Sequence, residues 1–377
     1  MKEFAFVQIG VLMSQVYNFS SGPSVLPEEV LEKAKNEIFN YKRTGVSVME
    51  LGASSREVEK LIEKAEKSLR KIMSIPPNYK ILFLPGGASS QFAAIPMNLL
   101  SDRKCADYIV SGKHSKKAVL EAKKYGDIAI AASSAGASPA FSTVPETKRS
   151  DFRPDADYVH ICFNNSVYGT TFHYIPDTGN IPLVADMSSY ILSEPFDVSK
   201  FALIYASSQQ NIGPAGMSVV IIRDDLLGAA HASTPSVLNY QILAETKSRF
   251  STPPIWSIYV ATLVFDWILS VGGLEEIKRR NERKASLLYD YLDSQFYYTA
   301  SVDKKCRSMM NVVFVTGDAD LDKKFIKEAE EAKLLNLAGD KNIGGMRASI
   351  YNAMPYEGVE KLVEFMKNFA AENPKLN

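Results

Sequence analysis

Short apolar runs alternate with amphipathic stretches along most of the chain. Between Val58 and Ile72, apolar side chains recur every three or four residues, which predicts an amphipathic helix. The preceding Ser54-Ser55-Arg56-Glu57 matches a capping box, and Pro27 opens another predicted helix that runs to Asn40. The apolar runs predict short buried strands at 81–84, 108–110, 128–131, 158–162, 183–185, 203–205 and 218–222. This alternation is typical of an α/β fold with a mostly parallel sheet covered by helices.

The pattern changes after about residue 270. A long helix is predicted over 273–295, then a strand at 311–315, a helix at 321–333, the run 346–351 and a last helix from Tyr356. We therefore predict a large domain over residues 16–270 and a smaller α+β domain over 271–377. Residues 1–15 form an N-terminal extension.

The extension has the outline of a weak signal peptide, with Lys2 followed by an apolar run. Glu3 and Gln8 interrupt that pattern, and no convincing small-residue cleavage site follows. The run is also too short to span a bilayer. We expect a packed or disordered extension and no membrane partner, with Met13 as an alternative start.

Composition narrows the function classes. The chain has 377 residues, with 43 Lys and Arg against 43 Asp and Glu, so no net field attracts nucleic acid or an anionic membrane. The three cysteines are far apart and the four histidines are scattered, so no metal motif is visible. Such sparse cysteines fit a reducing compartment, and we expect a cytoplasmic location.

Two segments at predicted strand ends carry candidate chemistry. Gly86-Gly87-Ala88-Ser89 joins a strand to a helix, where backbone N–H groups and the helix N-terminus favour an anion such as phosphate. The alternative is an ordinary tight turn. Asp186 ends another strand, where α/β sheets bind ligands, and could pair with a protonated ring nitrogen. The alternative is an aspartate that caps a loop.

Three further segments add polar groups. Ser251 and Thr252 offer two hydroxyls to a phosphate, and Arg347 offers a guanidinium to a carboxylate. The loop 206–216 follows a buried strand and would face the same crevice. Solvated side chains and a surface salt bridge are the alternatives. Together the segments indicate a phosphorylated ligand with a ring nitrogen, bound in a crevice of the α/β domain.

Long strings in the chain resemble the phosphoserine aminotransferase family, in order and over nearly the whole length from residue 16. They are the segments 17–23, 45–50, 91–98, 106–112, 185–189, 211–216 and 344–355. The resemblance implies the fold-type I architecture, with a mostly parallel seven-stranded sheet and a smaller C-terminal domain. It also implies pyridoxal 5′-phosphate as cofactor and a homodimer with shared active sites. The family makes phosphoserine and 2-oxoglutarate from 3-phosphohydroxypyruvate and glutamate, in serine biosynthesis.

Part of the family's cofactor shell is present by resemblance. Asp186 matches the partner of the pyridinium nitrogen, and Ser166 replaces a threonine near the ring hydroxyl. His114 replaces the tryptophan that stacks on the ring. The expected phosphate contacts are Ala88, Ser89, Gln209 and, from across the dimer, Ser251 and Thr252.

The catalytic and substrate residues depart from the family. Gln210 stands where a lysine forms the Schiff base and moves the proton, and glutamine can do neither. The family's two His-Arg pairs, which contact substrate, are Ala53-Ser54 and Asp340-Lys341 here; Arg347 is retained. The expected substrate positions are Ser54, Lys341 and Arg347. An engineered trap would explain Gln210 alone, whereas natural divergence explains all the departures.

Three interpretations stay open. The first is a catalytically silent or repurposed homologue. The second is an enzyme with changed chemistry, which holds pyridoxal or pyridoxamine phosphate noncovalently or uses Lys113 or Lys341 instead. The third is an ordinary phosphoserine aminotransferase, against which the missing lysine and cations argue.

Overall fold

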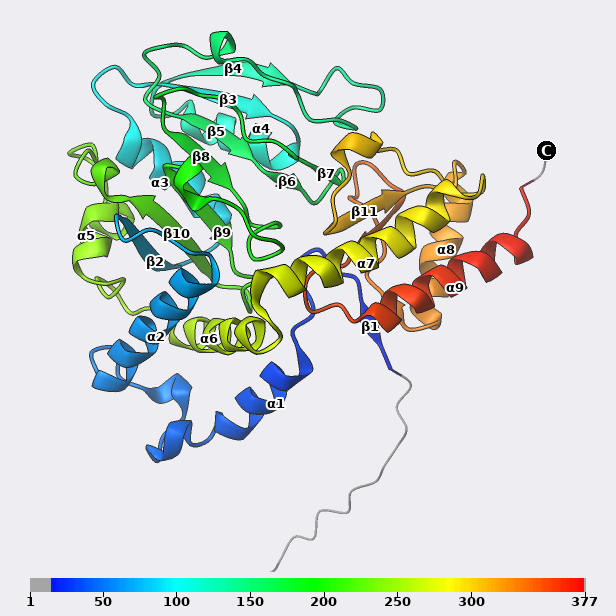
Figure 1. The fold of residues 1–377 in the computed structure, drawn as a ribbon, viewed down its shortest axis with the longest axis horizontal. Helices are drawn as coiled ribbons and strands as arrows, with labels where there is room; N and C mark the ends of the chain where they lie inside the picture. Colours follow the sequence, from blue (N-terminus) through cyan, green and yellow to red (C-terminus); the bar gives the residue numbers. More distant parts are fainter. Residues whose placement is uncertain (1–14, 376–377) are drawn as a thin grey trace, which may run out of the picture.

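The computed structural model describes residues 15–375, so all but the last residue of the predicted N-terminal extension lies outside it. A seven-stranded sheet in the order β2-β10-β9-β8-β5-β3-β4 forms its centre (Figure 1). Only β10 runs antiparallel to its neighbours in this sheet, so the predicted α/β fold with a mostly parallel sheet is confirmed. The strands are β2 (Tyr79–Pro85), β3 (Cys105–Val110), β4 (Asp127–Ser133), β5 (Val159–Cys162), β8 (Leu183–Asp186), β9 (Leu203–Ser207) and β10 (Met217–Arg223).

Helices cover both faces of the sheet, because its inner strands are apolar on both sides. One face packs against α3 (Ala88–Leu99), α4 (Lys113–Ala122) and α5 (Tyr240–Glu245). The other packs against α1 (Glu28–Glu37), α2 (Arg56–Ile72) and α6 (Ile255–Ser270). The capping box predicted Ser54 as the N-cap, but the cap lies one residue later: the Ser55 hydroxyl accepts a bond from the Val58 N–H at the start of α2.

Helix α6 was not predicted from the sequence. Most of its residues from Ile255 to Ile268 are buried, so it lacks the polar face that gives a surface helix its period. Its continuous apolar run cannot be distinguished from strand by periodicity alone. The helix lies beside α2 and forms the centre of one core.

The C-terminal part forms its own core around Phe314, Phe325 and Met366. Tyr17 and Phe19 from near the N-terminus join this core, since β1 pairs with β12. The division near residue 270 stays a prediction. The elements are α7 (Gly273–Asp293), α8 (Ala319–Glu331), α9 (Tyr356–Glu372), the pair β11 (Asn311–Phe314) and β13 (Met346–Ser349), and the pair β1 (Tyr17–Asn18) and β12 (Leu334–Leu335).

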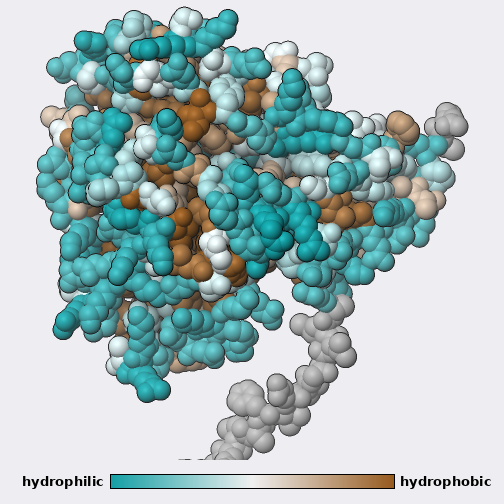
Figure 2. Space-filling view, in the orientation of Figure 1, coloured by the Kyte–Doolittle hydropathy of each residue, from teal (hydrophilic) through white to brown (hydrophobic). Residues whose placement is uncertain are grey.

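Most of the surface visible in Figure 2 is hydrophilic. Hydrophobic side chains are visible on it in patches between hydrophilic ones. Within residues 15–375, no single helix has the length and apolar character to cross a membrane; α6 and α7 meet the criterion only as a pair bent by 85°.

Candidate active site

A cavity of about 320 Å³ lies at the carboxyl edge of the large sheet. Strands β5, β8 and β9 are neighbours and end there at Cys162, Asp186 and Ser207. The short pair β6 (Asn164–Asn165) and β7 (Thr170–Thr171) follows β5 beside it. Seven of the predicted site residues line the cavity: Ala88, Ser89, His114, Ser166, Asp186, Gln209 and Gln210.

The turn between β2 and α3 forms one wall. Gly86 has a φ of +98°, which favours glycine, and its N–H bonds to the Gly216 carbonyl at 3.0 Å. Gly87 is the N-cap of α3, and the Ser90 hydroxyl donates to its carbonyl at 2.7 Å. Ala88 and Ser89 therefore occupy the first turn of a helix whose leading N–H groups lack partners within the helix. This wall is suited to an anion.

Asp186 supplies a buried carboxylate at the end of β8, with 4% of the side chain exposed. Its Oδ1 accepts bonds from the Ser188 N–H at 2.9 Å and the Ser188 hydroxyl at 2.6 Å. Burial raises the pKa of Asp186, and the two Ser188 bonds oppose the shift. Burial lowers the pKa of His114, against the attraction of Asp186. A neutral imidazole and a buried acid with a raised pKa thus face one cavity.

Gln210 is held in a fixed orientation. Its side chain is 9% exposed, and its Nε2 donates to the Ser21 carbonyl at 3.2 Å. Its own backbone carbonyl accepts from the Ser24 hydroxyl at 2.6 Å. The side-chain Oε1 is buried and finds no hydrogen-bond partner in the described part of the chain. A carbonyl acceptor stands where the resemblance predicts a nucleophilic amine.

The predicted substrate residues Arg347 and Lys341 do not line this cavity. Arg347, on β13, donates to the Ser166 carbonyl at 3.4 Å, and burial lowers its pKa. Its Nε is buried and unpaired within residues 15–375. Asp340 forms an ion pair with Lys113 at 2.6 Å, which lowers the pKa of Asp340. Lys341 is exposed. Lys113 and Lys341 were the two lysines considered as replacements for a lysine at 210. Lys341 is exposed to solvent, and Lys113 is paired with Asp340.

Ser54, Ser251 and Thr252 line a different, open cavity of about 630 Å³. All three are exposed. Within one chain the structure does not bring them to the cavity that contains Asp186. This separation is what contacts from across a dimer require, and the resemblance assigns such contacts to Ser251 and Thr252.

Several lining residues escaped the sequence analysis. Ser188 was not singled out, and Ser207 was included only as part of the loop 206–216, although each lies at or just after a strand end. That position was the signal that could have identified them. Cys162 is 3% exposed and also lines the cavity.

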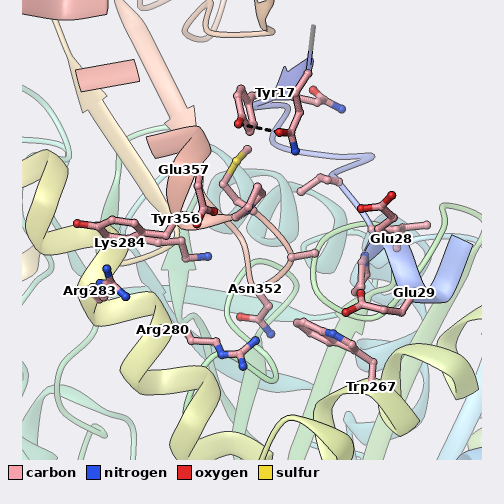
Figure 3. Close-up of a pocket in the computed structure, with 18 of the residues that line it drawn as sticks. Tyr17, Glu28, Glu29, Trp267, Arg280, Arg283, Lys284, Asn352, Tyr356 and Glu357 are labelled. Atoms are coloured by element: carbon pink, nitrogen blue, oxygen red, sulfur yellow. Dashed lines mark hydrogen bonds between the residues drawn. The ribbon is translucent and has the colours of Figure 1, made fainter. Parts of the chain in front are cut away.

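A third cavity, of about 540 Å³, lies between α1, α7 and α9 (Figure 3). Lys284 is 2% exposed there and donates to the Ile350 and Tyr351 carbonyls at 3.0 and 2.6 Å. Burial lowers the pKa of Lys284 to about 7. Its neighbours on α7 also have partners: Arg280 bonds to Glu276, and Arg283 stacks on Tyr356. Lys284 and Arg283 therefore connect α7 to the segment after β13 and to α9, whereas the Arg280 pair lies within α7.

Comparison with known proteins gives concordant results. The Aminotransferase class-V model matches residues 16–362. A phosphoserine aminotransferase of Bacillus cereus is 48% identical over 361 residues, which cover 96% of this chain and all of that protein. The structure of phosphoserine aminotransferase from Bacillus circulans subsp. alkalophilus matches with a TM-score of 0.91 and 42% identity, covering 95% and 99% of the two chains. The pyridoxal-phosphate-bound enzyme of Trichomonas vaginalis matches with a TM-score of 0.87 and 37% identity, covering 94% and 100%.

Proposed function

This chain belongs to the phosphoserine aminotransferases of the class-V family, whose cofactor is pyridoxal phosphate, and we propose that it holds this cofactor noncovalently and is impaired in transamination. Gln210 carries the proposal. An amide nitrogen is not nucleophilic, and this one donates to the Ser21 carbonyl. None of the described residues that line the cavity is a lysine that could replace it.

The remaining residues fit the cofactor. The first turn of α3 would hold the phosphate, and the buried Asp186 would pair with the ring nitrogen. His114, from α4, offers a flat ring for stacking, with less area than an indole. When bound, the cofactor supplies the electron sink that transamination needs. The chain would bind and orient it without a covalent bond.

The substrate side supports impaired catalysis. A charged hydrogen bond to a substrate anion is worth about 1.5–3 kcal/mol. Ser54 has no charge, Lys341 is exposed and Asp340 is acidic. Losing three such contacts would reduce turnover by at least about a thousandfold before the absence of a lysine at 210 is counted. Arg347 would remain as the one carboxylate contact.

We propose that the working unit is a homodimer with shared sites. Ser251 and Thr252 are exposed in the single chain, beside Ser54. The nearby segment 39–49 exposes apolar side chains: Phe39 at 87%, Val46 at 41% and Met49 at 57%. Exposed apolar groups of this size often mark an interface. A second copy would cover them and bring Thr252 to its partner's cavity. The three free cysteines support a cytoplasmic location.

An active phosphoserine aminotransferase is the second candidate. The names of relatives that are 48% identical over nearly the whole chain favour it. In that case the chain would convert 3-phosphohydroxypyruvate and glutamate to phosphoserine and 2-oxoglutarate by a route that does not need a lysine at 210.

One experiment separates the candidates. The purified dimer is titrated with pyridoxal phosphate, followed by absorbance, reduced with borohydride and weighed intact. Phosphoserine formation is assayed in parallel. We expect saturable binding, no mass increase from a site lysine and no efficient turnover. Vigorous turnover would favour the second candidate, and absence of binding would refute a kept cofactor site.

A further inference from the structure

We propose that Tyr205 and His160 form a buried hydrogen-bond chain behind Asp186, which keeps this carboxylate ionised for a protonated ring nitrogen in the cavity. Neither Tyr205 nor His160 lines the cavity, so both are positioning residues that act through Asp186. The inference rests on the proposed function, since it concerns the charge of the proposed cofactor site. Tyr205 in β9 is 0% exposed and His160 in β5 is 1% exposed.

The sheet brings the three side chains together. Asp186 and Tyr205 are paired residues on the neighbouring parallel strands β8 and β9. Paired residues on adjacent strands lie about 5 Å apart, with their side chains on the same face of the sheet. Burial raises the pKa of Asp186, and hydrogen bonds from Ser188 and from the Tyr205 hydroxyl oppose the rise. On its other side, the Tyr205 hydroxyl lies 2.9 Å from the Nε2 of His160.

The imidazole of His160 sets the direction of this chain. Burial lowers the pKa of His160 to about 3, so the ring is neutral at pH 7 and carries one N–H. Its Nδ1 is buried and has no hydrogen-bond partner within residues 15–375. Because buried N–H groups without a partner are rare, the hydrogen belongs on Nε2, which donates it to the Tyr205 oxygen. The Tyr205 O–H is then free to donate to Asp186, where a charged acceptor makes the stronger bond.

The imidazole that faces Asp186 from α4 adds no positive charge. Burial lowers the pKa of His114, against the attraction of Asp186. Three cations lower it further: Lys117, Lys113 and Arg347. His114 is therefore neutral at pH 7 and cannot hold the carboxylate ionised by its charge.

The ionisation of Asp186 thus depends on neutral donors. The other titratable group of the described cavity lining is the Cys162 thiol, whose pKa is raised well above its ordinary value by burial and by Asp186. The donors to Asp186 in the described structure are Ser188, which bonds to Oδ1 twice, and Tyr205. Since burial still raises the pKa of Asp186 overall, loss of one donor should favour the protonated acid.

The test compares two ligands at a series of pH values. 4-Deoxypyridoxine 5′-phosphate has the ring nitrogen and the phosphate of the cofactor but no aldehyde that could react with lysines. Its 1-deaza analogue carries C–H in place of the ring nitrogen and has nothing to pair with Asp186. Calorimetric titration of the full-length protein from about pH 8 to about pH 5 separates the two effects, because the phosphate titrates in both ligands. We expect the affinity for the first ligand alone to fall further as Asp186 takes up a proton.

Tyr205→Phe removes the hydroxyl and keeps the ring. The acid-side fall in affinity should begin at higher pH, because the carboxylate loses a donor. At the acidic end the ring-nitrogen ligand should bind about tenfold more weakly than to the original protein, and at the alkaline end the two proteins should converge. The deaza analogue should bind both alike. Tyr240→Phe is the matched control, since it removes another buried hydroxyl, which donates to Gln91 at 2.7 Å, and should leave the difference between the ligands unchanged.

Two variants of His160 test the outer end of the chain. His160→Phe keeps a flat ring beside Tyr108, on which the imidazole stacks at 4.6 Å, but loses the N–H. It should shift the pH profile in the same direction as Tyr205→Phe and by less, whereas His160→Gln restores a donor and should return the profile toward the original.

Circular dichroism checks that each variant folds, and if Tyr205→Phe does not fold, the two His160 variants decide. An unchanged pH profile in Tyr205→Phe, or an equal loss of affinity for both ligands, overturns the inference and leaves the proposed function standing. If neither ligand binds the original protein, the proposed function fails and the inference fails with it.

Discussion

The proposed cofactor wall and the proposed substrate side are built on different parts of the fold. Asp186 ends a buried strand, and Ala88 begins a helix that packs on the sheet. Ala53 and Ser54, and Asp340 and Lys341, lie outside the regular helices and strands. Strand-end residues are constrained by packing as well as by ligand, whereas loop residues are constrained mainly by ligand. The proposed impairment therefore places the altered residues in loops and the kept ones on the packed scaffold.

Gln210→Lys should have the largest effect, because it changes the cofactor wall and leaves the substrate side as it is. Because Gln210 lines the cavity beside Asp186, a lysine there should become covalently attached to pyridoxal phosphate. We expect a new absorbance band and, after borohydride, a mass increase of one cofactor. Gln210→Met is the control that should show neither.

Phosphoserine formation should stay orders of magnitude below that of an active relative in Gln210→Lys, because the substrate side is unchanged. Adding Ala53→His, Ser54→Arg, Asp340→His and Lys341→Arg should raise it. Near-normal activity in the single variant would show that these four positions do not limit turnover.

Asp186→Asn tests whether Asp186 contributes to cofactor affinity. Asparagine keeps the acceptor for the Ser188 bonds but loses the negative charge opposite the ring nitrogen. We expect cofactor affinity to fall about ten- to hundredfold at pH 7, measured by calorimetry. Asp177→Asn is a matched control, since the exposed Asp177 also accepts a bond from the N–H two residues later. Equal losses in both variants would contradict a cofactor role for Asp186.

Thr252→Ala tests whether the two surfaces meet in a dimer. Thr252 does not line the Asp186 cavity of its own chain, so any effect on cofactor binding must come through a second copy. We expect about a fivefold loss of affinity, the value of one neutral hydrogen bond. In Thr246→Ala, the control, the lost hydroxyl lies in the same open cavity but bonds to the Ile242 carbonyl. Sedimentation shows whether both variants stay dimeric, and unchanged affinity in Thr252→Ala would argue against a shared site.

The strands of the large sheet could be predicted because each is a short apolar run between polar turns. Helix α6 could not, since burial on nearly all sides removes the helical period. Asp186 and the turn before α3 were identifiable because strand ends and glycine turns have recognisable local patterns. The Lys113–Asp340 pair was not, because its members are 227 residues apart and only the folded chain brings them together.

Disrupting the Lys113–Asp340 pair should have the smallest effect of these changes. It tests whether the pair stabilises the fold. Lys113 and Asp340 have 31% and 13% of their side chains exposed, so the coupling should be about 1 kcal/mol. Lys113 lowers the pKa of Asp340, so the stabilisation is present above the unfolded pKa of about 3.9 and is lost as pH falls through the lower folded value. Urea unfolding of Lys113→Met, Asp340→Asn and the double variant should therefore give a coupling at pH 7 that declines toward pH 3. The exposed Lys323–Asp320 pair is the control and should show no measurable coupling. A pH-independent or absent coupling would mean that Asp340 does not stabilise the fold through Lys113.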